Sequence, residues 1–248
     1  KIDQYGFYIP AFPASGPLSI WMVLQWTPFL WQAGGEEINA EQTKVLFNSG
    51  AGVQALSLWK KIFDAEKFQN FTLTHDMGFA SGSIAMIMDG PWDLPEFRDI
   101  KNFEWGVANL PAGPVKKATY LAGENLAIFK QSRHPAEAWK FIKWILQPEN
   151  QAMFSMESGY LPVRRSALQL ESYKKFLDAD PGMKAFVEQI SISQARAPID
   201  YHRVEINQNI AEAVEKVLIG NSNIKKALDE AAYKSNRLLE SVVVIDSK

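Results

Sequence analysis

The sequence predicts an α/β protein, and three observations carry that prediction. Short apolar runs typical of strands are spaced by longer segments of helical periodicity in the first half of the chain. From Pro135 onward the pattern is mostly helical, and no internal repeat or low-complexity linker interrupts the 248 residues. Strands spaced by helices and followed by a helical tail favour an α/β arrangement over an all-β one.

Four strands are predicted in the first half of the chain. The first three end at proline or glycine-proline signals, which turn the chain. The four runs are Tyr5 to Pro10, Ile84 to Met88, Trp105 to Leu110 and Leu126 to Phe129.

Two helices are predicted between the first and second strands. Leu18 to Gln32 is apolar enough for a buried helix, which Pro28 must kink or split and which Gly34-Gly35 ends. The second follows Asn48-Ser49 and places Val53, Leu56 and Trp59 on one face, with Ile62 or Phe63.

The later helices are predicted from apolar spacing and from Pro and Gly at their ends. One starts at Pro135 with Ala138, Phe141 or Ile142, and Ile145 inward, and the next spans about Glu149 to Glu157. The remaining three begin at Asp180-Pro181, span Val204 to Ile219, and span Ile224 to about Leu239.

Composition excludes several classes of protein. Lys plus Arg number 26 against 28 Asp plus Glu, without a basic stripe, so neither nucleic acid nor an anionic membrane surface is expected as a partner. The absence of cysteine excludes disulfides, thiolate metal sites and cysteine nucleophiles. No run of about 18 apolar residues predicts a spanning helix. The start at Lys1 predicts a processed protein or a fragment.

Aromatic residues at turns point to a carbohydrate ligand. The sequence holds eight Trp, and Trp26, Trp31 and Trp92 stand beside Pro, Gly or polar residues. Sugars offer flat CH faces that stack on aromatic rings. Trp92 follows the strand Ile84 to Met88 and the turn Asp89-Gly90-Pro91. From the residues alone it is equally a ligand platform or a cap on the core.

No catalytic constellation is visible in the sequence. His75, His134 and His202 lack metal-ligand spacing, so neither a metal nor a cofactor is predicted. There is no nucleophile elbow and no phosphate-cradling glycine loop. Asp89, Asp93 and Glu124 remain open as a glycosidase carboxylate pair, although nothing in their spacing favours it.

Four stretches, taken together and in order, resemble the extracellular solute-binding proteins of bacterial ABC sugar importers, the family that includes maltose-binding protein. The first runs from Trp26 through Trp31 to Gly34-Gly35-Glu36, and the second contains Phe79, Gly82, Ala85-Met86, Gly90 and Trp92. The third runs from Leu110-Pro111 through Gly123 and Leu126-Ala127-Ile128 to Ser132-Arg133-His134-Pro135 and Ala138-Trp139-x-Phe141, and the fourth is Gly159-Tyr160-Leu161-Pro162-Val163-Arg164.

The resemblance implies a periplasmic-binding-protein-like fold of type II, with two α/β lobes that close on a sugar without catalysis. It assigns residues 1–106 and 163–248 to the C-terminal lobe and residues 107–162 to the N-terminal lobe. Members of the family have a further N-terminal segment before the strand that Tyr5 to Pro10 resembles. The resemblance therefore implies a truncated protein whose incomplete first lobe exposes apolar surface and favours self-association.

The resemblance also implies the ligand-binding residues. Trp92 matches the tryptophan that stacks on the sugar, Tyr160 and Arg164 match the segment returning to the cleft, and Gly123 and Glu124 match a loop that often reads Gly-Gly. Glu124 departs from that pair, so it either bonds a hydroxyl or shifts the site. Trp26 and Trp31 match the wall of the cleft, and Tyr120 and Asp93 complete the expected set.

The expected partners are a di- or oligosaccharide and, in the intact protein, the permease subunits. The expected location is periplasmic or extracellular, with membrane contact only through a lipid anchor or the permease. Two alternatives to transport remain at this stage, a glycoside hydrolase and a sugar-sensing interaction module.

Overall fold

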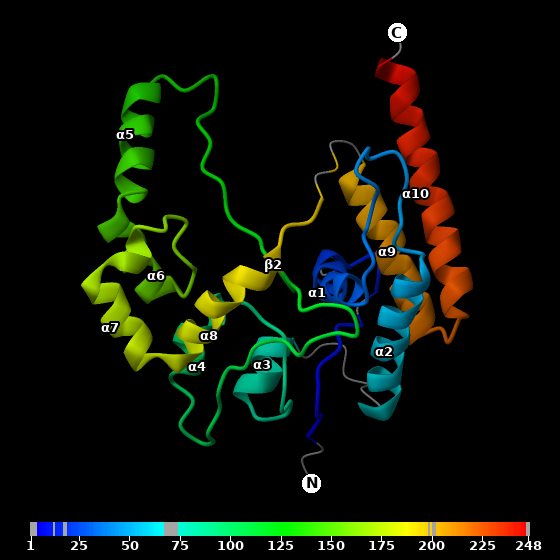
Figure 1. The fold of residues 1–248 in the computed structure, drawn as a ribbon, viewed down its shortest axis with the longest axis horizontal. Helices are drawn as coiled ribbons and strands as arrows, with labels where there is room; N and C mark the ends of the chain where they lie inside the picture. The colour runs from blue at the N-terminus through cyan, green and yellow to red at the C-terminus, as the bar shows by residue number, and fades with distance from the viewer. Residues whose placement is uncertain are drawn as a thin grey trace. The chain divides into compact units, whose positions relative to one another are not determined.

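The structure is a computed structural model that describes residues 4–11, 13–16, 19–66, 74–197, 199 and 202–246. The chain forms two compact units. Unit 1 combines residues 1–88, 110–121 and 192–248, and unit 2 combines residues 89–109 and 122–191. Figure 1 labels their helices and strands. The assignment of 107–162 to an N-terminal lobe stays a prediction.

Unit 1 is built mainly from helices around one apolar core. Its elements are α1 (Ser19–Gln32), α2 (Gly50–Glu66), α3 (His75–Ala80), β1 (Thr119–Tyr120), β2 (Ser193–Gln194), α9 (Arg203–Leu218) and α10 (Ile224–Asp246). α9 and α10 pack side by side (Figure 1), and α1 and α2 both contact α9. The core between them contains Trp26, Trp59, Ile210 and Leu228, all fully buried.

The predicted buried helix is confirmed as α1, although Leu18, its predicted first residue, lies outside the described residues. α1 continues through Pro28, so the chain does not split into two helices there. The Thr27 hydroxyl donates to the carbonyl oxygen of Val23 at 2.8 Å, within the turn that precedes the proline.

The predicted strands are largely absent from the described part of the chain. Tyr5 and Ile84 form one isolated parallel bridge, which Ala85 extends by donating from its backbone N–H to the Tyr5 carbonyl oxygen. The strands predicted at 105–110 and 126–129 are wrong, because both segments are irregular. A short apolar run becomes a strand only where a neighbouring strand supplies hydrogen-bond partners. The segment 126–129 does not pack as a strand, and its Phe129 side chain is 83% exposed.

The described sheet consists of β1 and β2 alone. They pair in parallel, with Thr119 opposite Ser193 and Tyr120 opposite Gln194. The class prediction holds in the sense that the described residues form helices and a small parallel sheet, but helices dominate.

Unit 2 contains short helices around a small core. Its elements are the 3-10 helices η1 (Pro91–Asp93) and η2 (Ala167–Gln169), and the α-helices α4 (Leu94–Phe97), α5 (Pro135–Ile145), α6 (Pro148–Ser158), α7 (Glu171–Ala179) and α8 (Pro181–Gln189). The 3-10 helix η3 (Ile190–Ile192) follows α8 at the boundary between the two units in sequence. The core is formed by Ala152, Ala167 and Tyr173, and the Tyr173 hydroxyl lies 2.8 Å from the hydroxyl of Ser155.

Helix α5 contributes no buried residue to unit 2. Ala138, Ile142 and Ile145 form its half-buried side, as predicted, whereas Trp139, Phe141 and Trp144 remain 52%, 54% and 50% exposed. Three large, half-exposed aromatic side chains on one short helix form an apolar patch of the kind that marks an interaction surface.

Candidate functional site

Unit 2 brings together two of the aromatic residues predicted to bind a ligand. Trp92 lies in η1 and is half-buried, and its ring centroid is 5.8 Å from that of Tyr160 at an angle of 37°. Tyr160 follows α6, is 36% exposed, and also contacts Phe154 at 6.3 Å. These three rings form an aromatic group in which Phe154 and Tyr160 are exposed and Trp92 is half-buried.

Two glycines allow this arrangement. Gly159 ends α6 in the left-handed conformation at φ 80°, and a Cβ there would overlap the carbonyl oxygen of Pro91. A Cβ at Gly90 would overlap the ring of Trp92. Because glycine has no Cβ, η1 approaches the end of α6 closely enough for Trp92 to reach Tyr160.

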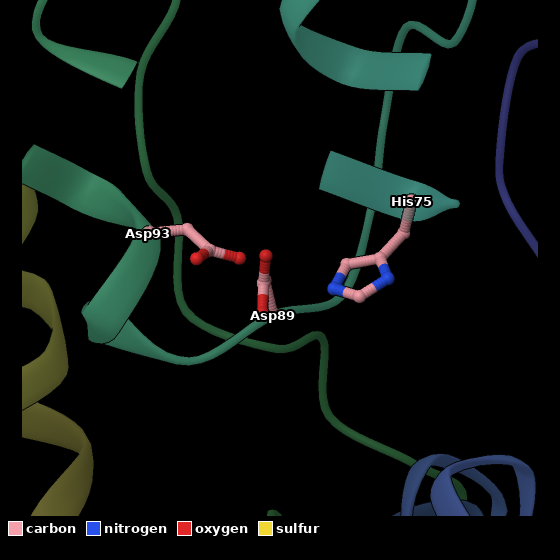
Figure 2. A group of neighbouring side chains, drawn as sticks. All are labelled: His75, Asp89 and Asp93. Carbon is pink, nitrogen blue, oxygen red and sulfur yellow. The ribbon is translucent and has the colours of Figure 1, made fainter. Parts of the chain in front are cut away.

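Two carboxylates flank Trp92 in sequence. Carboxylate oxygens of Asp89 and Asp93 lie within 4.8 Å of each other, and Figure 2 shows their side chains, from the turn before η1 and from its last residue. The backbone N–H of Gly90 donates to Asp89 Oδ1 at 2.7 Å, so Asp89 supports the turn that carries Trp92. His75, also drawn in Figure 2, belongs to unit 1.

The other predicted residues of unit 2 lie on its surface. Gly123 and Glu124 are exposed in irregular chain, and a Cβ at Gly123 would meet nothing within 4 Å. Arg164 is exposed and donates from Nη1 to the carbonyl oxygen of Leu146 at 3.1 Å. That bond ties the segment after Tyr160 to the end of α5.

Unit 1 holds the remaining predicted residues. Trp26 is 0% exposed in the core, and Trp31 is 1% exposed. Trp31 stacks on Tyr120, with ring centroids 6.3 Å apart at 16°. Burial raises the pKa of the half-buried Tyr120. Trp31 and Tyr120 thus form a second aromatic pair, whereas Trp26 supports the core beneath α1.

Gln32 at the end of α1 positions Tyr120. Its side-chain amide donates to the Ala118 carbonyl oxygen at 2.9 Å, and its backbone carbonyl oxygen accepts from the backbone N–H groups of Val115 and Lys116. These bonds fix the segment that leads into β1, so the Tyr120 ring is held over Trp31.

Sequence reasoning missed a charged cluster in unit 1. Arg196 donates through Nε to both carboxylate oxygens of Glu37, at 3.0 and 2.8 Å, and through Nη2 to Asn207 Oδ1 at 2.8 Å. Glu37 and Arg196 are separated by 159 residues, so the printed sequence gives no sign of this pair. The only signal was a charged residue directly after Gly34-Gly35-Glu36.

Comparisons with known proteins identify the family. The profile described as "Bacterial extracellular solute-binding protein" matches residues 4–185. Because that match spans most of the chain, the chain belongs to this family. The resemblance found in the sequence is therefore confirmed, and solute binding, not catalysis, is the activity that the family's description names.

Curated relatives agree with this assignment. A binding protein of Brucella abortus (strain 2308) is 25% identical over 218 residues, covering 85% of this chain and 52% of the relative. The sn-glycerol-3-phosphate-binding periplasmic protein of Escherichia coli (strain K12) is 25% identical over 174 residues, covering 65% of this chain and 39% of that protein.

Solved structures share the fold. The cyclic alpha-maltosyl-1,6-maltose binding protein from Arthrobacter globiformis superposes with a TM-score of 0.81 at 26% identity, covering 96% of this chain and 60% of that one. The sugar-binding protein MalE from Xanthomonas citri gives 0.80 at 24% identity, covering 100% and 61%. The periplasmic-binding-protein-like fold is thus confirmed. The chain spans about half the length of the first curated relative.

The described ranges were compared with the requirements of a membrane-spanning helix, which needs about 20 predominantly apolar residues. No helix there combines the length and the apolar character that crossing a bilayer requires.

Proposed function

We propose that this chain is the sugar-binding part of an extracytoplasmic solute-binding protein that delivers a di- or oligosaccharide to an ABC importer. The observation that carries the proposal is the aromatic group of Trp92, Tyr160 and Phe154, with Asp93 in the same 3-10 helix as Trp92. Accessible rings beside a carboxylate match a sugar, whose CH faces stack while its hydroxyls donate.

Each predicted residue has a proposed role. Trp92 and Tyr160 stack on sugar rings, Asp93 and Glu124 accept hydroxyl hydrogens, and Arg164 donates to hydroxyl oxygens. The open space around Gly123 lets backbone approach the ligand. In unit 1, the half-buried Tyr120 is the ring that a ligand can reach, while the almost fully buried Trp31 stacks on Tyr120 and, with Trp26, supports it.

The proposed mechanism is ligand binding without a chemical reaction. Ligand binding shifts the population from an open to a closed arrangement of the two lobes of the complete protein, because the closed form contacts the ligand from both lobes. The closed form then docks on the permease subunits. The proposed location is the periplasm or the cell surface, where a lipid anchor holds the full-length protein.

Calorimetric titration with maltose, maltotriose, glucose and glycerol 3-phosphate tests the proposal. We expect an oligosaccharide to bind and Trp92→Ala to weaken that binding at least tenfold, about 1.4 kcal/mol, because a stacking face is lost. Trp139→Ala is the matched control, since Trp139 is a half-exposed tryptophan of the same unit, on α5.

Two results would contradict the proposal: no oligosaccharide binds the folded chain, or Trp92→Ala leaves the affinity unchanged while only lowering stability. The second result would mean that Trp92 caps the core. A chain that binds sugar and also associates with a signalling partner instead of a permease would favour the alternative of a sugar-sensing interaction module.

A further inference from the structure

An ion pair in unit 2 anchors the segment that carries Trp92. Helix α4 begins directly after η1, so the two form one continuous segment, residues 91–97, called here the η1–α4 segment. Arg98 follows its last residue, and the Arg98 Nε and Nη2 donate to Oδ2 of Asp180 at 3.1 and 2.5 Å. The Arg98 and Asp180 side chains are 35% and 19% exposed, so water screens this pair only in part.

Asp180 links the η1–α4 segment to the junction of α7 and α8. It ends α7 and precedes the first residue of α8. Its Oδ1 accepts from the backbone N–H of Met183 at 2.9 Å and thereby caps α8, while its Oδ2 binds Arg98. The guanidinium carbon of Arg98 also lies 5.7 Å from the centre of the Phe176 ring on α7. Arg98 therefore contacts both helices.

This ion pair supplies an orientation that apolar packing does not. Helix α4 is a single turn, Leu94–Phe97, which is too short to be stable on its own. Leu94 and Phe97 are buried, but the burial of apolar side chains is non-directional. A guanidinium and a carboxylate instead bond in a defined orientation, because the donors lie in one plane. The pair thus limits how far α4 can turn about its buried side chains.

The η1–α4 segment is held at two points within unit 2. At the first, the Trp92 ring contacts Tyr160, which follows α6. At the second, Arg98 bonds Asp180 between α7 and α8. Helices α6 and α7 pack against each other, so both points belong to one packed frame. Two points fix the tilt of a short segment, whereas one leaves it free to turn.

We infer that Arg98 is a positioning residue of the ligand site. Through Asp180 it fixes the tilt of the η1–α4 segment, and thereby the places of Trp92 and Asp93, without contacting the ligand. A ring that is held before binding loses less conformational freedom when a sugar stacks on it, so the pair raises affinity. The inference rests on the proposed function, which it deepens by naming a residue that sets the geometry of the stacking ring.

Two substitutions break the pair in different ways. Arg98→Gln removes the positive charge. Asp180→Asn removes the negative charge but retains a side-chain oxygen, and Asn is a good N-cap, so α8 stays capped. Because both remove the same contact, we expect equal effects and little further effect in the double variant. Arg133→Gln, at an exposed arginine of the same unit, is the matched control.

Fluorine NMR of the chain labelled with 5-fluorotryptophan reports on the Trp92 ring without any ligand. The sequence contains eight tryptophans, and Trp92→Phe identifies the resonance of Trp92. We expect Arg98→Gln and Asp180→Asn to shift or broaden that resonance and Arg133→Gln to leave it unchanged. Ala167→Gly removes a fully buried methyl group from the core of unit 2, so it lowers stability while leaving the Trp92 resonance in place.

Two fluorine results overturn the inference. One is a Trp92 resonance that does not change in Arg98→Gln. The other is an equal change in Ala167→Gly, which would mean that any loss of stability in unit 2 moves the ring. Far-UV circular dichroism checks that each variant is folded.

Calorimetric titration with maltose and maltotriose then measures the effect on binding. We expect Arg98→Gln and Asp180→Asn to bind about fivefold more weakly, as for the loss of one coupled contact, and Arg133→Gln to bind unchanged. If a sugar binds the unchanged chain and Arg98→Gln equally well, the inference fails and the proposed function stands. If neither sugar binds while the Trp92 resonance depends on Arg98, the proposed function fails and the control of Trp92 by Arg98 stands.

Discussion

At the scale of single residues, glycines decide where the aromatic ligand group can form. Gly159 has a left-handed backbone and lies close to the carbonyl oxygen of Pro91. Any residue with a Cβ would be strained there by its backbone conformation and would also overlap that oxygen. The position of Trp92 against Tyr160 depends on that approach. Sequence reasoning saw glycine at this point as the end of a helix and not as a spacer between two elements.

Replacing Gly159 with Ala tests this spacing. We expect Gly159→Ala to lower the free energy of unfolding by about 2 kcal/mol, because left-handed backbone costs an L-residue roughly 1–2 kcal/mol and the methyl group also overlaps backbone. Urea unfolding measures the change. Gly123→Ala is the control, since it meets open space. Equal effects of the two substitutions would show that Gly159 is not a spacer.

At the level of single residues, the sequence motifs singled out two aromatic residues that meet in unit 2 but did not reveal the buried charged pair of unit 1. Trp92 and Tyr160 were both predicted for the ligand site, and their ring contact in unit 2 is compatible with that prediction without testing it. Arg196 and Glu37 were missed, because a buried ion pair between residues 159 positions apart leaves no local pattern. Trp31 and Trp26 were expected at a cleft wall, and both are almost fully buried in the structure.

At the scale of secondary-structure elements, unit 2 contains a fully buried polar contact between two helices. Ser155 on α6 and Tyr173 on α7 are both 0% exposed, and their hydroxyls lie 2.8 Å apart. Burial raises the pKa of Tyr173, although its bond to Ser155 partly opposes that effect. The pair satisfies two hydroxyls in a core that contains few buried side chains.

Removing one hydroxyl of this pair should lower the free energy of unfolding more than removing both hydroxyls. We expect Tyr173→Phe to destabilise the chain by about 1–3 kcal/mol, since the Ser155 hydroxyl is left buried without a partner. The double variant Ser155→Ala and Tyr173→Phe should recover part of that loss. Chemical denaturation of the single and double variants gives the coupling energy. A purely additive result would contradict the role of the hydrogen bond.

Helices were predicted better than strands because their signal is local. The spacing of Val53, Leu56 and Trp59 was enough to find α2, since a helix satisfies its own backbone. A strand depends on a partner that is distant in sequence. The runs at 105–110 and 126–129 have strand-like composition, yet they remain irregular in the structure without such a partner.

At the scale of the whole molecule, the exposed aromatic side chains of α5 are the main departure from an ordinary soluble surface. Trp139, Phe141 and Trp144 lie on a helix that has no fully buried residue. The chain spans 60% of the length of the Arthrobacter protein. These facts support the proposal that the chain alone associates with itself through apolar surface.

Charged substitutions on α5 test that proposal. We expect the unchanged chain to associate with rising concentration, and Trp139→Glu with Trp144→Glu to restore a monomer, because buried apolar contact drives the association. Sedimentation velocity from micromolar concentrations upward measures it. Tyr233→Glu, at a 69% exposed position on α10, is the control. A monomer at every concentration would refute self-association.

The division of the chain also has a consequence for how the protein folds. Unit 1 is assembled from three separate segments, and in its core α1 and α2 pack against α9, and α2 against α10, across more than a hundred residues of sequence. Contacts of such high sequence separation form slowly and only after both partners exist. The core of unit 1 therefore cannot be completed until α10 as far as Leu239 has been synthesised, and until then the apolar faces of α1 and α2 lack their packing partners, which favours aggregation.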